Sequence, residues 1–145
     1  MPTANTQFSI AIHLMAGLGY GHGEAVTSNQ LAMSVNTSPS FVRRTLAKLS
    51  KAGLVRTTTG KSGSCALAKN AQKISLLQIY KAVGVPKTFS IHEYPVQKAC
   101  PVSCHIYGSV DKVLNKTQKA FEQSLSKMRL ADVIKEIKKQ KGRGL

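Results

Sequence analysis

The chain of 145 residues carries 21 lysine and arginine residues against 6 aspartate and glutamate residues, which gives a formal net charge of +15 at pH 7. This length suits one domain, or one small domain with an assembly element, and the charge favours a polyanionic partner such as nucleic acid. With so few acids, and with no nucleophile, base and orienting acid at a recognised spacing, the sequence does not predict an enzyme.

The sequence also bears on the compartment. The N-terminus lacks a positively charged leader region, and no apolar run approaches the ~20 residues needed to span a bilayer. We therefore expect a cytoplasmic protein with no membrane partner. In that reducing compartment the three cysteines are expected to be thiols, ligands or redox sensors, not a disulfide framework.

The first predicted helix covers residues 6–18, TQFSIAIHLMAGL, which are apolar nearly all round and run into the glycine-rich LGYGHG. A helix of this composition belongs in a core. His13 lies within it and is interpreted as a hydrogen-bonded core histidine, with a ligand as the alternative.

Two short helices joined by a three-residue turn are predicted between residues 27 and 52. Thr27 or Ser28 suits the N-cap of the first helix, and Ser38 followed by Pro39 suits the start of the second. Along the second helix, apolar residues recur at i, i+4 and i+7, and polar and cationic residues gather on the opposite side. This is the pattern of a helix-turn-helix. The apolar residues are Val42, Leu46 and Leu49, and the opposite side holds Ser40, Arg44, Lys48 and Lys51.

A basic hairpin follows this helix directly, because residues 54–68, LVRTTTGKSGSCALA, indicate two strands around a Gly-Lys-Ser-Gly turn. A helix-turn-helix with such a hairpin is a winged helix, in which the second helix enters the major groove and the hairpin reaches phosphates or the minor groove. The alternative is an ordinary amphipathic surface helix. An RNA-binding accessory protein is disfavoured, because only 6% of the residues are aromatic.

The predicted fold class is mainly α with a small β-hairpin wing, in the form of a winged helix-turn-helix domain (residues 1–84) plus a long dimerisation helix (107–130). A cysteine-bearing regulatory loop (85–106) precedes that helix, and a short helix with a basic tail (131–145) follows it. The long helix is expected because apolar residues recur every seven positions, a seam that would pair with a second copy. The alternative is that it folds back on its own domain. The seam residues are Tyr107, Leu114, Phe121 and Met128, with Val110 and Thr117 between them.

Three segments in this order carry a family resemblance: SPSFVRRTLAKLSKAGLV, TGKSGSCALA, and SLLQIYKAVG before a cysteine-bearing loop and long helix. Together they resemble the IscR/NsrR/CymR family of bacterial winged-helix transcriptional regulators over nearly the whole chain. The resemblance implies a homodimer that binds double-stranded DNA at a partly palindromic operator and represses transcription. A regulator that acts mainly through a complex with a partner enzyme is the alternative.

The resemblance also suggests DNA contacts, with bases read from the start of the second helix. In the wing, Thr59 stands where the family has an arginine, so Lys61 and Arg56 become the expected contacts. Arg43 is of special interest, because an arginine that bonds guanine bidentately discriminates between bases by ~1–3 kcal/mol. The predicted DNA-binding residues are Ser28, Ser38, Ser40, Phe41, Arg43, Arg44, Lys48, Arg56 and Lys61.

Cys100, Cys104 and Cys65 are the predicted regulatory residues, and three interpretations stay open for them. The first is a thiol switch, which includes a disulfide between Cys100 and Cys104 or a link to Cys65. The second is an iron–sulfur cluster on Cys100, Cys104 and His92 or His105, although cluster-binding relatives place three cysteines in this loop and this chain has two. The third is cysteines that only pack, or that line a pocket for a small effector. No cofactor, metal site or catalytic residue is predicted.

Overall fold

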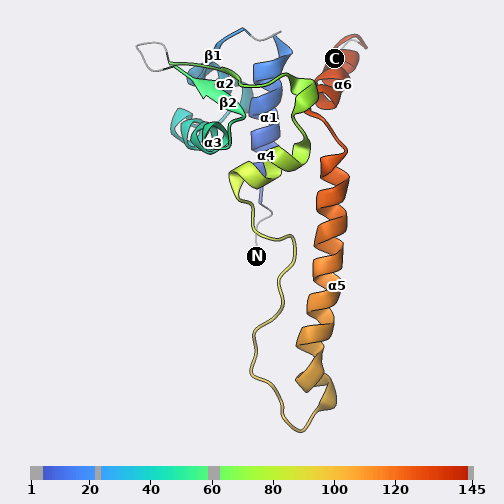
Figure 1. The fold of residues 1–145 in the computed structure, drawn as a ribbon. Coiled ribbons are helices and arrows are strands. Elements are labelled where there is room, and N and C mark those ends of the chain that lie inside the picture. Colours follow the sequence, from blue (N-terminus) through green and yellow to red (C-terminus); the bar gives the residue numbers. More distant parts are fainter. Residues whose placement is uncertain (1–4, 22–23, 59–62, 144–145) are drawn as a thin grey trace.

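The computed structural model describes residues 5–21, 24–58 and 63–143. A compact group of helices and a small sheet lies at one end, and one long helix extends away from it (Figure 1). The elements are α1 (Gln7–Tyr20), β1 (Val26–Thr27), α2 (Ser28–Val35), α3 (Pro39–Lys51), β2 (Val55–Thr57), β3 (Ser64–Leu67), a 3-10 turn η1 (Ala71–Lys73), α4 (Leu76–Val83), α5 (Pro101–Ser126) and α6 (Leu130–Lys141).

Helix α1 is the centre of the domain, and α2, α3, α4 and α6 all pack against it. Its Leu14, Met15 and Leu18 are completely buried, and burial of each such side chain is worth about 1.5–3 kcal/mol. The predicted core helix is therefore confirmed. The interpretation of His13 as a core residue is wrong, because it lies on the exposed side of α1, where its Nε2 is 2.8 Å from Oγ of Ser34.

The sheet has three antiparallel strands in the order β1-β3-β2. The predicted hairpin is β2 and β3, with Val55 opposite Leu67 and Thr57 opposite Cys65. The third strand, β1, was not predicted, since it is two residues long and pairs Val26 with Cys65. We call residues 55–67 the wing. Residues 59–62 of the wing, including Lys61, lie outside the described residues.

The predicted boundaries of the long helix and the cysteine loop are wrong. Helix α5 begins at Pro101, six residues earlier than predicted, because a proline suits the first helical position and Cys100 is the N-cap residue. Cys104 therefore lies in the first turn of a helix, not in a loop. At the other end α5 stops at Ser126, and the backbone N–H of Arg129 donates to Asp132, which starts α6.

The C-terminal part of α5 packs on α4 of its own chain. The rings of Phe121 and Tyr80 meet edge to face at 5.4 Å, and Nε2 of Gln118 donates to Oη of Tyr80 at 3.0 Å. The predicted apolar seam is therefore divided: Phe121 packs in the chain itself, and Tyr107 remains 58% exposed near the other end of α5. Met128 lies beyond the end of the helix.

The N-terminal half of α5 projects beyond the domain, and residues 85–100, which we call the linker, run beside it (Figure 1). The backbone N–H of Thr88 donates to Oε1 of Gln118 at 3.3 Å, and Nζ of Lys87 donates to Oδ1 of Asn115 at 3.4 Å. These bonds tie the linker to α5. Among the described residues, no helix has the length and apolar character required to cross a bilayer.

Candidate nucleic-acid interface

The turn between α2 and α3 is fixed by its own capping residues. Oγ1 of Thr27 accepts from the backbone N–H of Gln30, whose side-chain oxygen accepts from the N–H of Thr27, so α2 starts with a complete capping box. After α2, Asn36 adopts the left-handed conformation at φ 66°. Ser38 then caps α3 by accepting from the N–H of Phe41. The hydroxyl of Ser38, a predicted base contact, thus sets the start of the helix.

Helix α3 has one buried and one exposed side, as predicted. Val42, Leu46 and Leu49 are at most 2% exposed and join the core. The cationic side chains all lie on the solvent-exposed side, namely Arg43, Arg44, Lys48 and Lys51. Because all four side chains are exposed to solvent, this side of α3 can face a polyanion.

The residues at the start of α3 have different surroundings. Ser40 is exposed, whereas Phe41 is only partly so. The guanidinium of Arg44 lies 5.8 Å from the centre of the Phe41 ring, a cation–π distance. This contact places the Phe41 ring beneath the guanidinium of Arg44.

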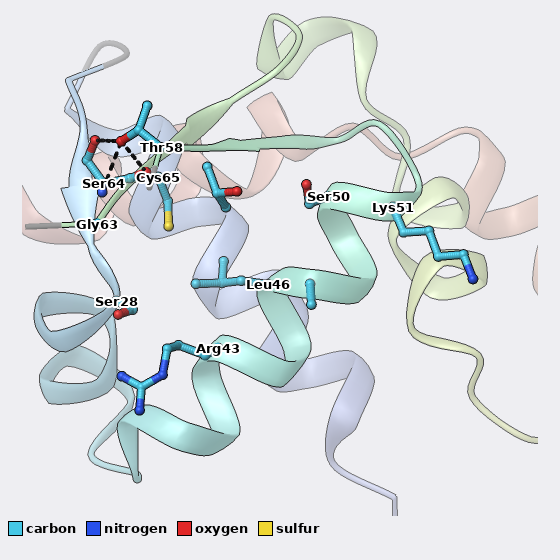
Figure 2. A pocket seen from close by; sticks show the side chains of 11 residues that line it. Ser28, Arg43, Leu46, Ser50, Lys51, Thr58, Gly63, Ser64 and Cys65 are labelled. Carbon is cyan, nitrogen blue, oxygen red and sulfur yellow. Dashed lines mark hydrogen bonds between the residues drawn. The ribbon is translucent and has the colours of Figure 1, made fainter. Parts of the chain in front are cut away.

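A groove of about 540 Å³ lies between α3 and the wing, and we call it the recognition groove. Arg43 reaches it from α3 and Ser28 from the start of α2, and the two side chains lie near each other in Figure 2. The structure therefore brings together two predicted DNA-binding residues that are 15 positions apart in the sequence. The remaining lining residues are Leu46, Ala47, Ser50, Lys51, Thr57, Thr58, Gly63, Ser64 and Cys65.

The wing side of this groove is held by a pair of hydroxyl residues that sequence reasoning did not select. The Oγ atoms of Thr58 and Ser64 are 2.6 Å apart, and the N–H of Thr58 donates to the carbonyl oxygen of Ser64 at 2.9 Å. Dashed lines mark the side-chain bonds in Figure 2. The sequence offers one indication of this pair, because both residues stand beside the predicted turn, where side chains of paired strands meet.

Arg56 does not join the recognition groove. Successive side chains of a strand point to opposite faces, so Thr57 faces α3 and Arg56 faces away from it. Arg56 instead lines a separate hollow with Gly19, Lys69 and Asn70. Arg56 is exposed on this other face of the wing, and its contact with DNA stays a prediction.

The three cysteines have different environments. Cys65 is 5% exposed beneath the recognition groove, and burial raises the pKa of its thiol. Cys104 is exposed, with its Sγ 3.5 Å from the carbonyl oxygen of Lys98 in the linker. Cys65 lies in the same core as Leu125, which is near the C-terminal end of α5. Cys100 lies at the opposite end of this helix, which has 26 residues and is about 39 Å long. A link within one chain from Cys65 to Cys100 or Cys104 is thus excluded.

The geometry near Cys100 also disfavours the other predicted disulfide. The N–H of Cys104 donates to the carbonyl oxygen of Cys100 at 3.1 Å, as in a regular helical turn. Cysteines at i and i+4 of such a turn do not meet disulfide geometry, so this bond would require the first turn of α5 to unwind.

The donor groups near Cys100 do not fit an iron site. Across the ranges that the structure describes, no three side chains of His, Cys, Asp or Glu gather closely enough to hold a metal ion. An iron–sulfur cluster takes four ligands, mostly thiolates. Neither His92 nor His105 joins Cys100 and Cys104 in such a group, so these residues do not fit an iron–sulfur cluster.

Comparison with known proteins shows the family of the chain. Residues 4–136 match the family model Rrf2, described as "Iron-dependent Transcriptional regulator". YwnA of Bacillus subtilis (strain 168), whose name classes it as an HTH-type transcriptional regulator, is 34% identical over 134 residues, which are 92% of this chain and 98% of YwnA.

Solved structures are also similar. A crystal structure of a protein classed as DNA-binding has a TM-score of 0.71 at 31% identity and covers 88% of this chain and 98% of its own. The structure of CymR, the global cysteine regulator of B. subtilis, has a TM-score of 0.66 at 19% identity, with coverage of 94% and 98%. At that identity CymR supports the fold alone.

Proposed function

Because the chain belongs to the Rrf2 family of transcriptional regulators, we propose that it is a homodimeric repressor that reads a partly palindromic operator with α3 and the wing of each subunit. The observation that carries this proposal is the recognition groove. Its apolar floor belongs to the folded core, and Arg43 and Lys51 border it from α3. An arginine in this position can bond a base edge in a groove of the DNA, and lysines suit contacts with phosphates.

The experiment is selection of binding sites from random DNA, followed by titration of the best site at several salt concentrations. We expect a palindromic consensus with half-sites about 34 Å apart, and an affinity that falls steeply with salt because phosphate contacts release counterions. Equal affinity for selected and random DNA would refute sequence-specific reading. A complex that persists at high salt would instead indicate a protein partner such as an enzyme.

The projecting half of α5 supports the dimer. It carries Val102, Tyr107 and Val113, which are 66%, 58% and 61% exposed in the single chain. Apolar side chains along a helix that leaves its own domain are expected to pack against a second copy. Sedimentation should give twice the 15.6 kDa of one chain. Val113→Lys should shift the protein toward monomers, and the milder Val113→Ala should shift it less.

Regulation through Cys104 is the finer part of the proposal. A peroxide would transfer one oxygen atom to the sulfur of Cys104 and leave as water, giving a sulfenic acid. The larger, polar group could not keep the present contacts of the sulfur with the carbonyl oxygens of Gln97 and Lys98. Displacement of the linker would then tilt α5 and change the spacing of the two α3 helices. Peroxide should weaken operator binding in the wild type and not in Cys104→Ser; equal loss in both would refute this role.

A further inference from the structure

A second groove lies away from the DNA-binding surface, between α1, α2 and α6, with a volume of about 610 Å³. We call it the α1–α2–α6 groove. Its walls are mainly apolar and come from three helices, including Ile12 and Ala16 of α1, Leu31 of α2, and Val133 and Ile137 of α6. A volume of this size is typical of small-molecule sites.

Close packing of α1 against α2 and α6 fixes the position of the walls of this groove. A Cβ on Gly17 would lie 3.0 Å from Leu31, and a Cβ on Gly19 would collide with the side chain of Ile134. Leu31 and Ile134 are both buried. Glycines at these positions let α1 approach α2 and α6 closely, so the groove is part of the fold and not a gap between loose side chains.

One end of the groove is polar, and two cations lie close to the other end. At one end, Nε2 of His13 and Oγ of Ser34 are 2.8 Å apart. At the other, the Tyr20 ring lines the groove. The ammonium groups of Lys138 and Lys141 do not line the groove themselves, but they lie 5.5 and 5.9 Å from the centre of this ring. The described lining residues include no Asp or Glu. This combination suits an apolar body with one negative charge.

We propose that the α1–α2–α6 groove binds a small aromatic carboxylate. The aromatic ring lies between the aliphatic side chains of Ile12, Val133 and Ile137, with Tyr20 offering an aromatic neighbour. The carboxylate pairs with the ammonium groups of Lys138 and Lys141. A helix of a partner protein fits less well, because both cations lie beside a single lining residue, Tyr20, and the positive charge is therefore local.

The test uses 2-naphthoate as the probe and its neutral amide, 2-naphthamide, as the matched ligand. Titration into the full chain is followed by the methyl NMR signals of isoleucine. The signals of Ile12 and Ile137 should shift with one saturating site per chain, whereas that of Ile79, which is completely buried in α4, should stay in place. No shift, or equal shifts of all three signals, would overturn the proposal.

Two variants then test the roles of charge and shape. Replacing both lysines (Lys138→Gln with Lys141→Gln) should weaken 2-naphthoate about 2- to 30-fold, as expected for two exposed ion pairs, and leave 2-naphthamide unchanged. Equal effects on both ligands would refute the carboxylate. Ile137→Trp should fill the groove and weaken the binding of both ligands at least about tenfold, the loss expected when a ligand misfits an apolar pocket by about one methylene group. Ile137 is 43% exposed, so circular dichroism should show an intact fold.

A second copy of the chain is the competing occupant. If Ile137→Trp or saturating 2-naphthoate changes the sedimentation coefficient from that of the dimer, the groove is an interface between copies and the proposal is wrong. An unchanged coefficient together with the methyl shifts supports it.

Ligand binding here should also change operator affinity, a consequence that rests on the proposed function. Helix α2 lines this groove and also packs on α3. We expect a ligand that shifts α2 to alter operator affinity, and by linkage DNA must then alter ligand affinity by the same factor. Methyl shifts without any change in operator affinity would refute this coupling. Failure of the ligand-free protein to select an operator would refute the proposed function instead.

Discussion

Replacement of Arg43 separates base reading from general attraction to DNA. Arg43 lines the recognition groove beside Ser28, and Lys48 lies on the exposed side of α3 without lining that groove. Arg43→Ala should therefore reduce discrimination between operator bases by about 1–3 kcal/mol per half-site, or about 5- to 150-fold. Lys48→Ala should weaken binding to all sequences alike and lower the salt slope by about 1.

The assay is fluorescence anisotropy on the selected operator and on a set in which each base pair of one half-site is changed. Single half-site changes keep the effect of one Arg43 distinct from that of its symmetry mate. Both residues are exposed, so thermal melts should stay close to wild type. If Arg43→Ala keeps the wild-type ratio between operator and altered sites, Arg43 does not read bases. If Lys48→Ala changes that ratio instead, the two roles are reversed.

Three further predictions concern the core, the wing and the buried thiol. Leu49→Ala removes a completely buried side chain and should lower the free energy of unfolding by about 2–5 kcal/mol in urea titrations. Thr58→Val removes the hydroxyl bonds to Ser64 and should cost about 0.5–1.5 kcal/mol per bond while weakening operator binding; unchanged DNA affinity would rule out a role of this pair in wing geometry. A thiol reagent should label Cys104 before Cys65. Because burial raises the pKa of Cys65, its neutral form is favoured in the fold. As the pH rises above about 8.5, the usual pKa of a cysteine, stability should fall more steeply in wild type than in Cys65→Ala.

The helix-turn-helix could be predicted because its signals are local. Ser38 and Pro39 mark a helix start, and the spacing of Val42, Leu46 and Leu49 defines a buried side, so each expectation depends on residues a few positions apart. The hairpin was equally accessible from its turn residues. These local preferences agree with the tertiary packing, which is why the structure retains them.

Features set by distant contacts could not be predicted. Strand β1 has two residues and exists only because Val26 meets Cys65 across the sheet. The direction of Arg56 depends on which face of the wing covers α3, and that face is chosen by packing rather than by composition. Three residues of the predicted seven-residue repeat lie in α5, but the repeat could not show that one of them, Phe121, packs on Tyr80 of the same chain.

One side chain connects the parts of the molecule that a regulatory signal must join. Gln118 accepts from the backbone N–H of Thr88 in the linker and donates to the hydroxyl of Tyr80 in α4. Tyr80 also contacts Phe8 of α1 and Phe121 of α5, and α4 packs on α3. Under the proposed regulation, a displaced linker would remove one of the two hydrogen bonds of the Gln118 amide. The change would reach α3 through Tyr80, which is buried, while Phe8 is partly buried and Phe121 partly exposed. Since packed cores shift between discrete arrangements, a small movement at the linker can become a change in the orientation of α3.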